Sequence, residues 1–447
     1  MLSLYTLGKS YERRDNMKNR WSLCVKNFGK IGNAEIEVSP LMFFIGDNNS
    51  GKSYLMSLLW GIVNKGYELF FTREAYECES YIELKRWYDE NSDENSLVIN
   101  NEFRKLLVNW FNYILELRKD SLIKSIFNKE ISSDKVFIKL IDSGDEEINL
   151  NTIKNEVTGK FIILNKDKLN DYQEDIGKLC YYVLFSEYKR TAFNQEEPLF
   201  LPASRTGFML TYKTLINESL KSSYGNDNIQ RSKFTTPIIN FLNKFVDLNV
   251  EINGRYADIV KFMEKELLKG KIVEDESPVK NIYYKPENLN ENLPLYLTSS
   301  LVTEVAPLVL FLSDVNSDFK TLIIEEPEAH LHLKAQIVMA RVVTRLINSG
   351  LNVWITTHSD TFMQQINNLM KLNVHADKEK LLKQLNLEKE DCLDISKVRV
   401  YEFDINENKT TVTAIKNSET GFPLPTFNNV ISKLMDEVMI LEDEEND

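Results

Sequence analysis

The feature that most constrains this chain is the stretch at residues 43–53, which reads FFIGDNNSGKS. The apolar run at residues 41–45 predicts a buried strand, residues 46–53 fit the pattern G-x-x-x-x-G-K-S, and the apolar spacing of residues 54–60 predicts a helix. A phosphate-binding loop requires this order of strand, loop and helix, and a chance match in a loop lacks it. The stretch therefore predicts a nucleotide site in an α/β protein.

Each position of the loop has a chemical reason. Gly46 and Gly51 let the backbone curl so that its N–H groups face a polyphosphate, and the start of the helix adds a partial positive charge. Lys52 is expected to reach the β- and γ-phosphates, and the Ser53 hydroxyl is expected to bind Mg²⁺. The predicted ligands are thus ATP and Mg²⁺, and the predicted loop contacts also include Asn48, Asn49 and Ser50.

Composition sets broad limits. The chain has 447 residues, 43% of them hydrophobic, which is enough for a large core. A formal net charge of −13 argues against a protein that coats nucleic acid with its whole surface, while leaving room for a local basic groove. No apolar run has the length of a membrane span, and the first residues lack the pattern of a signal peptide. The cysteines are scattered without a C-x-x-C pair, so we expect a reducing, cytoplasmic setting: Cys24, Cys78, Cys180 and Cys392.

A second motif lies far along the chain, at residues 321–332. An apolar strand ends there in two carboxylates, Glu325 and Glu326, followed by Pro327. Glu325 is expected to hold Mg²⁺, directly or through water, and Glu326 to orient or deprotonate an attacking water. The alternative is a pair of exposed carboxylates in a turn.

The two motifs together resemble a known group of ATPases. Residues 25–29, VKNFG, followed by the loop at 46–53, are similar to SMC-like and OLD-like ATPases (the overcoming-lysogenization-defect family), whose loop is typically GxNxxGKS, with Asn48 at its Asn. Residues 325–332 match the E-E-P-E-x-x-L-H pattern of the same heads. The resemblance implies an ABC-type ATPase head, a P-loop NTPase fold.

This resemblance implies further roles. His358 follows another apolar strand and matches the switch histidine that senses the γ-phosphate. Ser299 and Ser300, at a predicted helix start, stand where a signature loop grips the γ-phosphate bound by a partner protomer, although Leu301 replaces the usual glycine. The alternative for these serines is a simple helix cap. His330 and His332 fit a loop facing the dimer partner better than a metal site, because no third ligand stands at a usual spacing.

Arg205 lies in the stretch PASRTG at residues 202–207, after another apolar run, and similar stretches occur in OLD-like relatives. It is expected to contact phosphate or to pair with a carboxylate near the site, with a structural ion pair or a helix-start contact as the alternative.

The predicted organisation is one head assembled from residues 17–65 and 291–430, a large, mostly helical insertion at 66–290, and a helix end with an acidic tail at 431–447. Within it we expect strands at 136–141 and 161–164 and a closing hairpin of 398–403 with 410–415. Asp391, Asp394 and Asp404 are interpreted as turn and cap residues.

OLD-like ATPases often belong to bacterial anti-phage systems, and many carry a C-terminal Toprim nuclease. Too little chain follows His358 for that domain. The resemblance therefore implies a cytoplasmic homo-oligomer that sandwiches ATP and acts as the sensor or regulator of a separate effector, a nuclease or toxin, triggered by DNA or a phage protein. The alternatives are a DNA-repair-type head that binds DNA directly and an ATP-dependent scaffold with little turnover.

Overall fold

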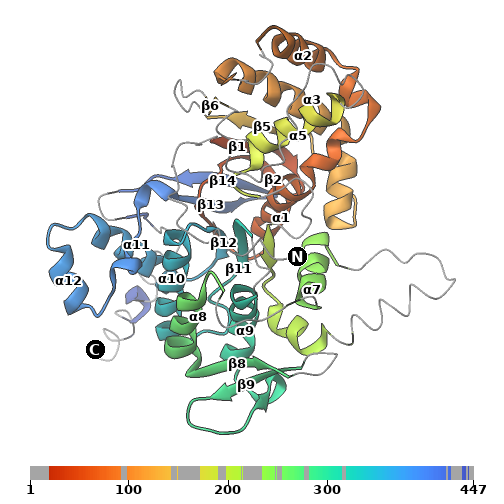
Figure 1. The fold of residues 1–447 in the computed structure, drawn as a ribbon. Helices are drawn as coiled ribbons and strands as arrows, with labels where there is room; N and C mark the ends of the chain where they lie inside the picture. The colour runs from red at the N-terminus through yellow and green to blue at the C-terminus, as the bar shows by residue number, and fades with distance from the viewer. Residues whose placement is uncertain are drawn as a thin grey trace.

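The residues that the structure describes form a nine-stranded mixed sheet with helices on both faces (Figure 1). The computed structural model describes residues 20–91, 98–141, 148–149, 172–189, 198–212, 214, 234–246, 248, 254–275, 281–314, 319–418, 421–423, 435–438 and 441. The strand expected at 161–164 and the acidic tail lie outside them. In the order β5-β1-β2-β14-β13-β3-β12-β11-β7, the strands are Lys135–Leu140, Trp21–Phe28, Ile31–Glu37, Lys409–Ile415, Val398–Asn406, Leu41–Gly46, Asn352–Thr357, Thr321–Glu325 and Leu199–Leu201.

One half of the sheet is parallel and the other half mostly antiparallel. Strands β13, β3, β12, β11 and β7 run parallel to one another, whereas β1 pairs antiparallel with both β2 and β5. Strands β3, β12, β11 and β7 are buried along almost their whole length because both of their faces are covered. In β3, Phe43 packs into the core on one face and Phe44 into the core on the other. The predicted strand at 41–45 and the hairpin of β13 with β14 are confirmed.

One face of the sheet carries the helix that follows the phosphate loop. Helix α1 (Lys52–Lys65) is buried on nearly every side, so it forms the centre of this core. Around it pack α3 (Asn101–Phe127) and α5 (Tyr172–Phe185), and α3 in turn contacts α2 (Glu79–Asn91). Figure 1 shows α2, α3 and α5 gathered at the upper end of the molecule, beyond β1 and β5. Short elements complete this part: 3₁₀ turns at Gly66–Phe70 and Arg73–Tyr76, and strands β4 (Val98–Ile99) and β6 (Ile148–Asn149).

The other face is covered by helices from the second half of the chain. They are α7 (Thr236–Val246), α8 (Ala257–Met263), α9 (Ser300–Ser313), α10 (Leu333–Asn348) and α11 (Asp360–Val374). Helix α8 continues as a π-helical turn at Glu264–Leu268 and leads into a small sheet of β8 (Gly270–Glu274), β9 (Ile282–Pro286) and β10 (Leu293–Pro294). The remaining elements are α12 (Lys378–Gln384) and 3₁₀ turns at Leu295–Leu297, Lys389–Asp391 and Ile395–Lys397.

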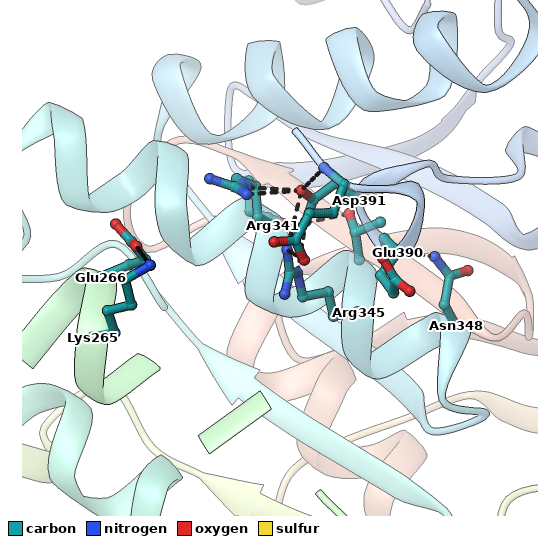
Figure 2. Close-up of polar contacts among 10 residues, drawn as sticks. Lys265, Glu266, Arg341, Arg345, Asn348, Glu390 and Asp391 are labelled. Atoms are coloured by element: carbon teal, nitrogen blue, oxygen red, sulfur yellow. Dashed lines mark hydrogen bonds and ion pairs between the residues drawn. The ribbon is translucent and has the colours of Figure 1, made fainter. Parts of the chain in front are cut away.

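A buried ion-pair cluster connects the turn at Lys389–Asp391 to helix α10 (Figure 2). Asp391, which is fully buried, accepts hydrogen bonds from Arg341 Nη2 at 2.8 Å and from Arg345 Nε at 2.7 Å, both on α10. The guanidinium groups also stack on the ring of Phe262 from α8, at 4.9 and 3.8 Å. Asp391 accepts the Glu388 N–H, which agrees with its interpretation as a turn and cap residue, and it also binds two arginines, which the sequence did not predict.

The main sheet also includes strands from the segment predicted to be an insertion. The segment 66–290, predicted to be a mostly helical insertion between the two halves of the head, contributes two strands to this sheet. Strand β5 pairs along the whole of β1, and the short apolar strand β7 pairs with β11. Both sheet edges thus come from this segment. No helix within the described part of the chain is both long and apolar enough to cross a membrane.

Candidate nucleotide site

Four loops meet at the carboxyl ends of the parallel strands. They are residues 46–51 after β3, 326–332 after β11, 358–359 after β12 and 202–204 after β7. Because neighbouring parallel strands end at the same edge of a sheet, segments far apart in sequence come together there, and this edge is where open α/β sheets bind their ligands.

The phosphate loop has the backbone that its pattern predicts. Gly46, Asn49 and Gly51 have φ values of 126°, 63° and 97°. A Cβ on Gly46 would lie 2.3 Å from the carbonyl oxygen of Phe403 on β13, so only glycine fits there. Residues with positive φ in such a turn help to direct neighbouring N–H groups toward one concave side, which favours an anion.

Lys52 lies within the loop at the first turn of α1. Its ammonium donates to the carbonyl oxygens of Gly46 at 2.9 Å and Asp47 at 2.6 Å, and to Ser50 Oγ at 3.3 Å. Burial lowers the pKa of Lys52 to about 8. Nearby carboxylates raise this pKa and oppose the effect of burial, and Glu326 has the largest influence among them. Ser50 is buried, whereas the predicted contact residues Asn48, Asn49 and Ser53 are exposed to a ligand.

Glu325 ends β11 beside the phosphate loop. Burial raises the pKa of its carboxyl group, against hydrogen bonds from the Ser53 side chain and the Ala203 N–H, the latter 3.3 Å from Oε2. Its Oε1 is buried and has no hydrogen-bond partner among the residues that the structure describes. An unpartnered carboxylate oxygen next to an exposed serine hydroxyl fits Mg²⁺, which binds oxygen ligands and keeps several waters.

Glu326 and His358 face each other across the ends of β11 and β12. His358 Nε2 lies 3.7 Å from Glu326 Oε1, and both side chains are partly exposed. The pKa of His358 is lowered, first by burial and then by the charge of Lys52, so the ring is neutral at neutral pH. Glu326 has a left-handed backbone with φ of 46°, and its N–H donates to the carbonyl of Thr356 at 2.8 Å.

Glu328 was not singled out from the sequence, yet it joins the two loops. Its Oε1 accepts from the His358 N–H at 2.7 Å and from Thr357 Oγ1 at 2.8 Å. Burial raises the pKa of Glu328, against these hydrogen bonds. The signal in the sequence was that Glu328 is the third acidic residue of the E-E-P-E stretch. In the structure, Glu328 holds the backbone N–H of His358.

The structure places Arg205 beneath these carboxylates. Its buried guanidinium forms an ion pair with Glu304 at 2.6 Å and donates to the backbone carbonyls of Glu325 and Glu326. This buried ion pair fits both the predicted pairing with a carboxylate near the site and the alternative of a structural ion pair. Its contact with phosphate stays a prediction. Glu304, on α9, was missed because nothing local in its sequence distinguishes it.

Ser299 and Ser300 lie at the exposed N-terminus of α9, and no hydrogen bond joins them to Lys52 or Glu326 within the described part of the chain. Ser299 stands at the cap position, but its side chain makes no capping hydrogen bond, so the simple-cap alternative is not supported. The 3₁₀ turn before it leaves Tyr296 and Leu297 exposed. Among the described residues, no group of three or more His, Cys, Asp or Glu side chains could hold a metal ion.

The mixed sheet and its phosphate loop define an α/β P-loop ATPase, which confirms the predicted α/β P-loop class. The family described as "AAA ATPase domain" matches residues 21–363, so the chain belongs to this family, and membership indicates binding of ATP and Mg²⁺ in general. No curated protein matches the chain.

Three solved structures align with most of the chain at low identity. An SMC head bound to the C-winged helix domain of ScpA has 12% identity and a TM-score of 0.39, covering 89% of this chain and 98% of that one. An SMC head from Thermotoga maritima has 11% identity and a TM-score of 0.33, covering 89% and 99%. An Smc head from Pyrococcus furiosus with an extended coiled coil, bound to the C-terminal domain of ScpA, has 14% identity and a TM-score of 0.35, covering 94% and 99%.

Proposed function

We propose that this protein hydrolyses ATP in the presence of Mg²⁺ at the loop edge of its parallel sheet, in an assembly of at least two copies. The observation that carries the proposal is the position of Glu326 and His358 beside the phosphate loop, with Glu326 Oε1 3.7 Å from His358 Nε2. A carboxylate poised beside a neutral histidine is suited to orienting a water molecule for attack on a phosphoryl group.

The residues have distinct parts in this reaction. The N–H groups of residues 46–51 and the start of α1 hold the phosphates, and Lys52 places its positive charge on the β- and γ-phosphates. Ser53 and Glu325 would hold Mg²⁺, whose charge offsets that of the phosphates. Glu326 orients the attacking water, and His358 contacts the γ-phosphate. Little covalent chemistry is needed from the protein, because positioning and charge stabilisation lower the barrier.

Exposed groups support a site completed by a second copy. Ser299 and Ser300 present hydroxyls and N–H groups at the start of α9, beside Tyr296 and Leu297, which are 72% and 64% exposed. At the site's own edge, Leu333 at the start of α10 is 64% exposed. Contact between two copies would bury these exposed apolar side chains while the serines of one copy meet the nucleotide of the other.

We further propose that the assembly regulates a separate effector, a nuclease or toxin, in a bacterial anti-phage system, in the cytoplasm. This rests on the similarity of the phosphate loop and the E-E-P-E stretch to OLD-like ATPases. The trigger would be DNA or a phage protein. Copurification from cells expressing the Glu326→Gln variant tests the effector: a nuclease or toxin retained with ATP supports it, and direct DNA binding without a protein partner favours a DNA-repair-type head.

The enzymatic part has its own test. Phosphate release is measured for the wild type and for Lys52→Ala, with Mg²⁺ and with a chelator. The proposal expects turnover only in the wild type with Mg²⁺, since Lys52 and the metal both act on the phosphates. Equal phosphate release by the Lys52→Ala variant would show that the activity comes from another site or a contaminant.

A further inference from the structure

Arg205 joins three segments that are distant in sequence. Its Nε donates to the carbonyl of Glu304 at 3.2 Å, and Nη1 donates to the carbonyls of Pro202 at 3.2 Å and Glu325 at 2.6 Å. Its Nη2 donates to the carbonyl of Glu326 at 3.0 Å and pairs with Glu304 Oε1 at 2.6 Å. The guanidinium therefore makes four hydrogen bonds to backbone carbonyls and one ion pair, all within the protein.

The partner of Arg205 belongs to the helix that begins with the exposed serines. Glu304 lies four residues after Ser300, hence one turn further along α9, and its side chain is 1% exposed. Its second oxygen accepts from the Thr206 hydroxyl, so the next residue of the 202–206 segment holds the same carboxylate. Because an α-helix is stiff over one turn, a displacement of its N-terminus would move Glu304 as well.

The other end of this connection is the backbone of Glu326. A left-handed conformation such as its φ of 46° is unfavourable for a non-glycine residue. Its carbonyl is held by two donors, Arg205 Nη2 and the Ala329 N–H, each at 3.0 Å. Arg205 therefore helps to hold the peptide from which the water-orienting carboxylate projects.

We propose that Arg205 is a positioning residue that couples the start of α9 to Glu326, so that contact of Ser299 and Ser300 with a nucleotide on a second copy of this chain adjusts the carboxylate that orients water. This inference rests on the proposed function. Lysine cannot replace Arg205 in this role, because its single ammonium cannot reach acceptors on three segments in the fixed geometry of a guanidinium.

The test compares two disruptive variants with a matched control. Arg205→Lys keeps the positive charge but loses the planar guanidinium with its several N–H donors. The milder Thr206→Val removes only the hydroxyl that donates to Glu304. The control is Arg345→Lys, which alters another arginine that binds a buried carboxylate, Asp391. For each protein, kcat, KM and the equilibrium Kd for ATP are measured over a range of protein concentrations.

The coupling predicts a specific pattern. In the wild type and in Arg345→Lys, kcat per chain rises with protein concentration as copies associate. In Arg205→Lys, kcat falls about 100-fold, the cost of misplacing a reacting group by about 1 Å, and its rise with concentration is lost. Thr206→Val shows the same change to a smaller extent. In Arg205→Lys and Thr206→Val, the Kd for ATP stays within about twofold of the wild-type value, because neither substitution changes the phosphate loop.

Two outcomes overturn the coupling alone. In the first, the wild type is active and the variants have a lower kcat, but their kcat still rises with protein concentration as it does in the wild type. Arg205 would then only stabilise the local structure. In the other, the Kd for ATP rises while kcat is unchanged, which makes Arg205 a ligand contact. A wild type without turnover at any concentration would instead refute the proposed function, and the coupling with it.

Discussion

The carbonyl oxygen of Phe403 lies where a side chain at Gly46 would have to be: a Cβ there would stand 2.3 Å from that oxygen. The contact arises because β13 runs parallel to β3 and pairs with it up to the first residue of the phosphate loop. The C-terminal hairpin is thus a wall of the nucleotide site, although it lies more than three hundred residues further along the chain.

This relationship predicts the effect of Gly46→Ala. The added methyl group must displace β13 or the loop, and the φ of 126° is strained for any other residue, so ATP affinity should fall at least tenfold, a cost of about 1.4 kcal/mol. Isothermal titration measures the affinity. The matched control is Gly207→Ala, where a Cβ has no neighbour within 4 Å, and its affinity should equal that of the wild type. Unchanged ATP affinity in Gly46→Ala would contradict the assigned loop geometry.

ATP affinity should depend on pH through Lys52. Burial lowers its pKa to about 8, and the phosphates favour the protonated form. Below that pH the lysine is already charged and Kd is constant. Above it, binding must take up a proton, so Kd should rise about tenfold per pH unit until the pKa of the complex is reached. Titrations from about pH 7 to about pH 9.5 measure this. Lys52→Met should bind weakly with no such slope, and a flat wild-type profile would refute the assignment.

The Asp391 cluster should dominate the stability of the second half of the chain. Asp391→Asn leaves two arginines without their buried partner, so the free energy of unfolding should fall by about 3–5 kcal/mol at neutral pH. Guanidinium denaturation measures it. The control is Glu77→Gln, which removes an exposed pair with Arg73 and should cost less than about 1 kcal/mol. A cost for Asp391→Asn no larger than the control's would show that the cluster contributes little.

The same cluster has a predictable pH dependence. Burial raises the pKa of Asp391, but hydrogen bonds from Arg345 and then Arg341 outweigh it and leave the pKa below its ordinary value of 3.8. Because the folded-state pKa is the lower one, the stabilisation is complete above the unfolded pKa and is lost as the pH falls through the folded value. The difference in unfolding free energy between wild type and Asp391→Asn should therefore shrink only under acid conditions, below about pH 4. A difference that already narrows near neutral pH would contradict this sign.

The sequence predicted the parts of the site that are local. The phosphate loop, the carboxylates at 325–326 and His358 each follow an apolar strand directly, so their position at the sheet edge could be predicted from short patterns. What could not be predicted depends on long-range packing. The pairing of β5 with β1 and of β7 with β11 is a matter of register between distant segments. The ion pair of Arg205 with Glu304 spans about a hundred residues, and although the stretch at 202–207 singled out Arg205, no local pattern identifies Glu304 as its partner.

The account's central claim is that Glu326 orients the attacking water in an assembly held together by ATP. The most direct measurement is ATP turnover together with oligomeric mass, for the wild type and Glu326→Gln, with and without ATP. We expect the wild type to hydrolyse ATP and the variant to lose about 10²–10⁴ in rate while accumulating as a larger ATP-bound assembly. Turnover by Glu326→Gln at the wild-type rate, or a mass that ATP leaves unchanged in both proteins, would contradict the account.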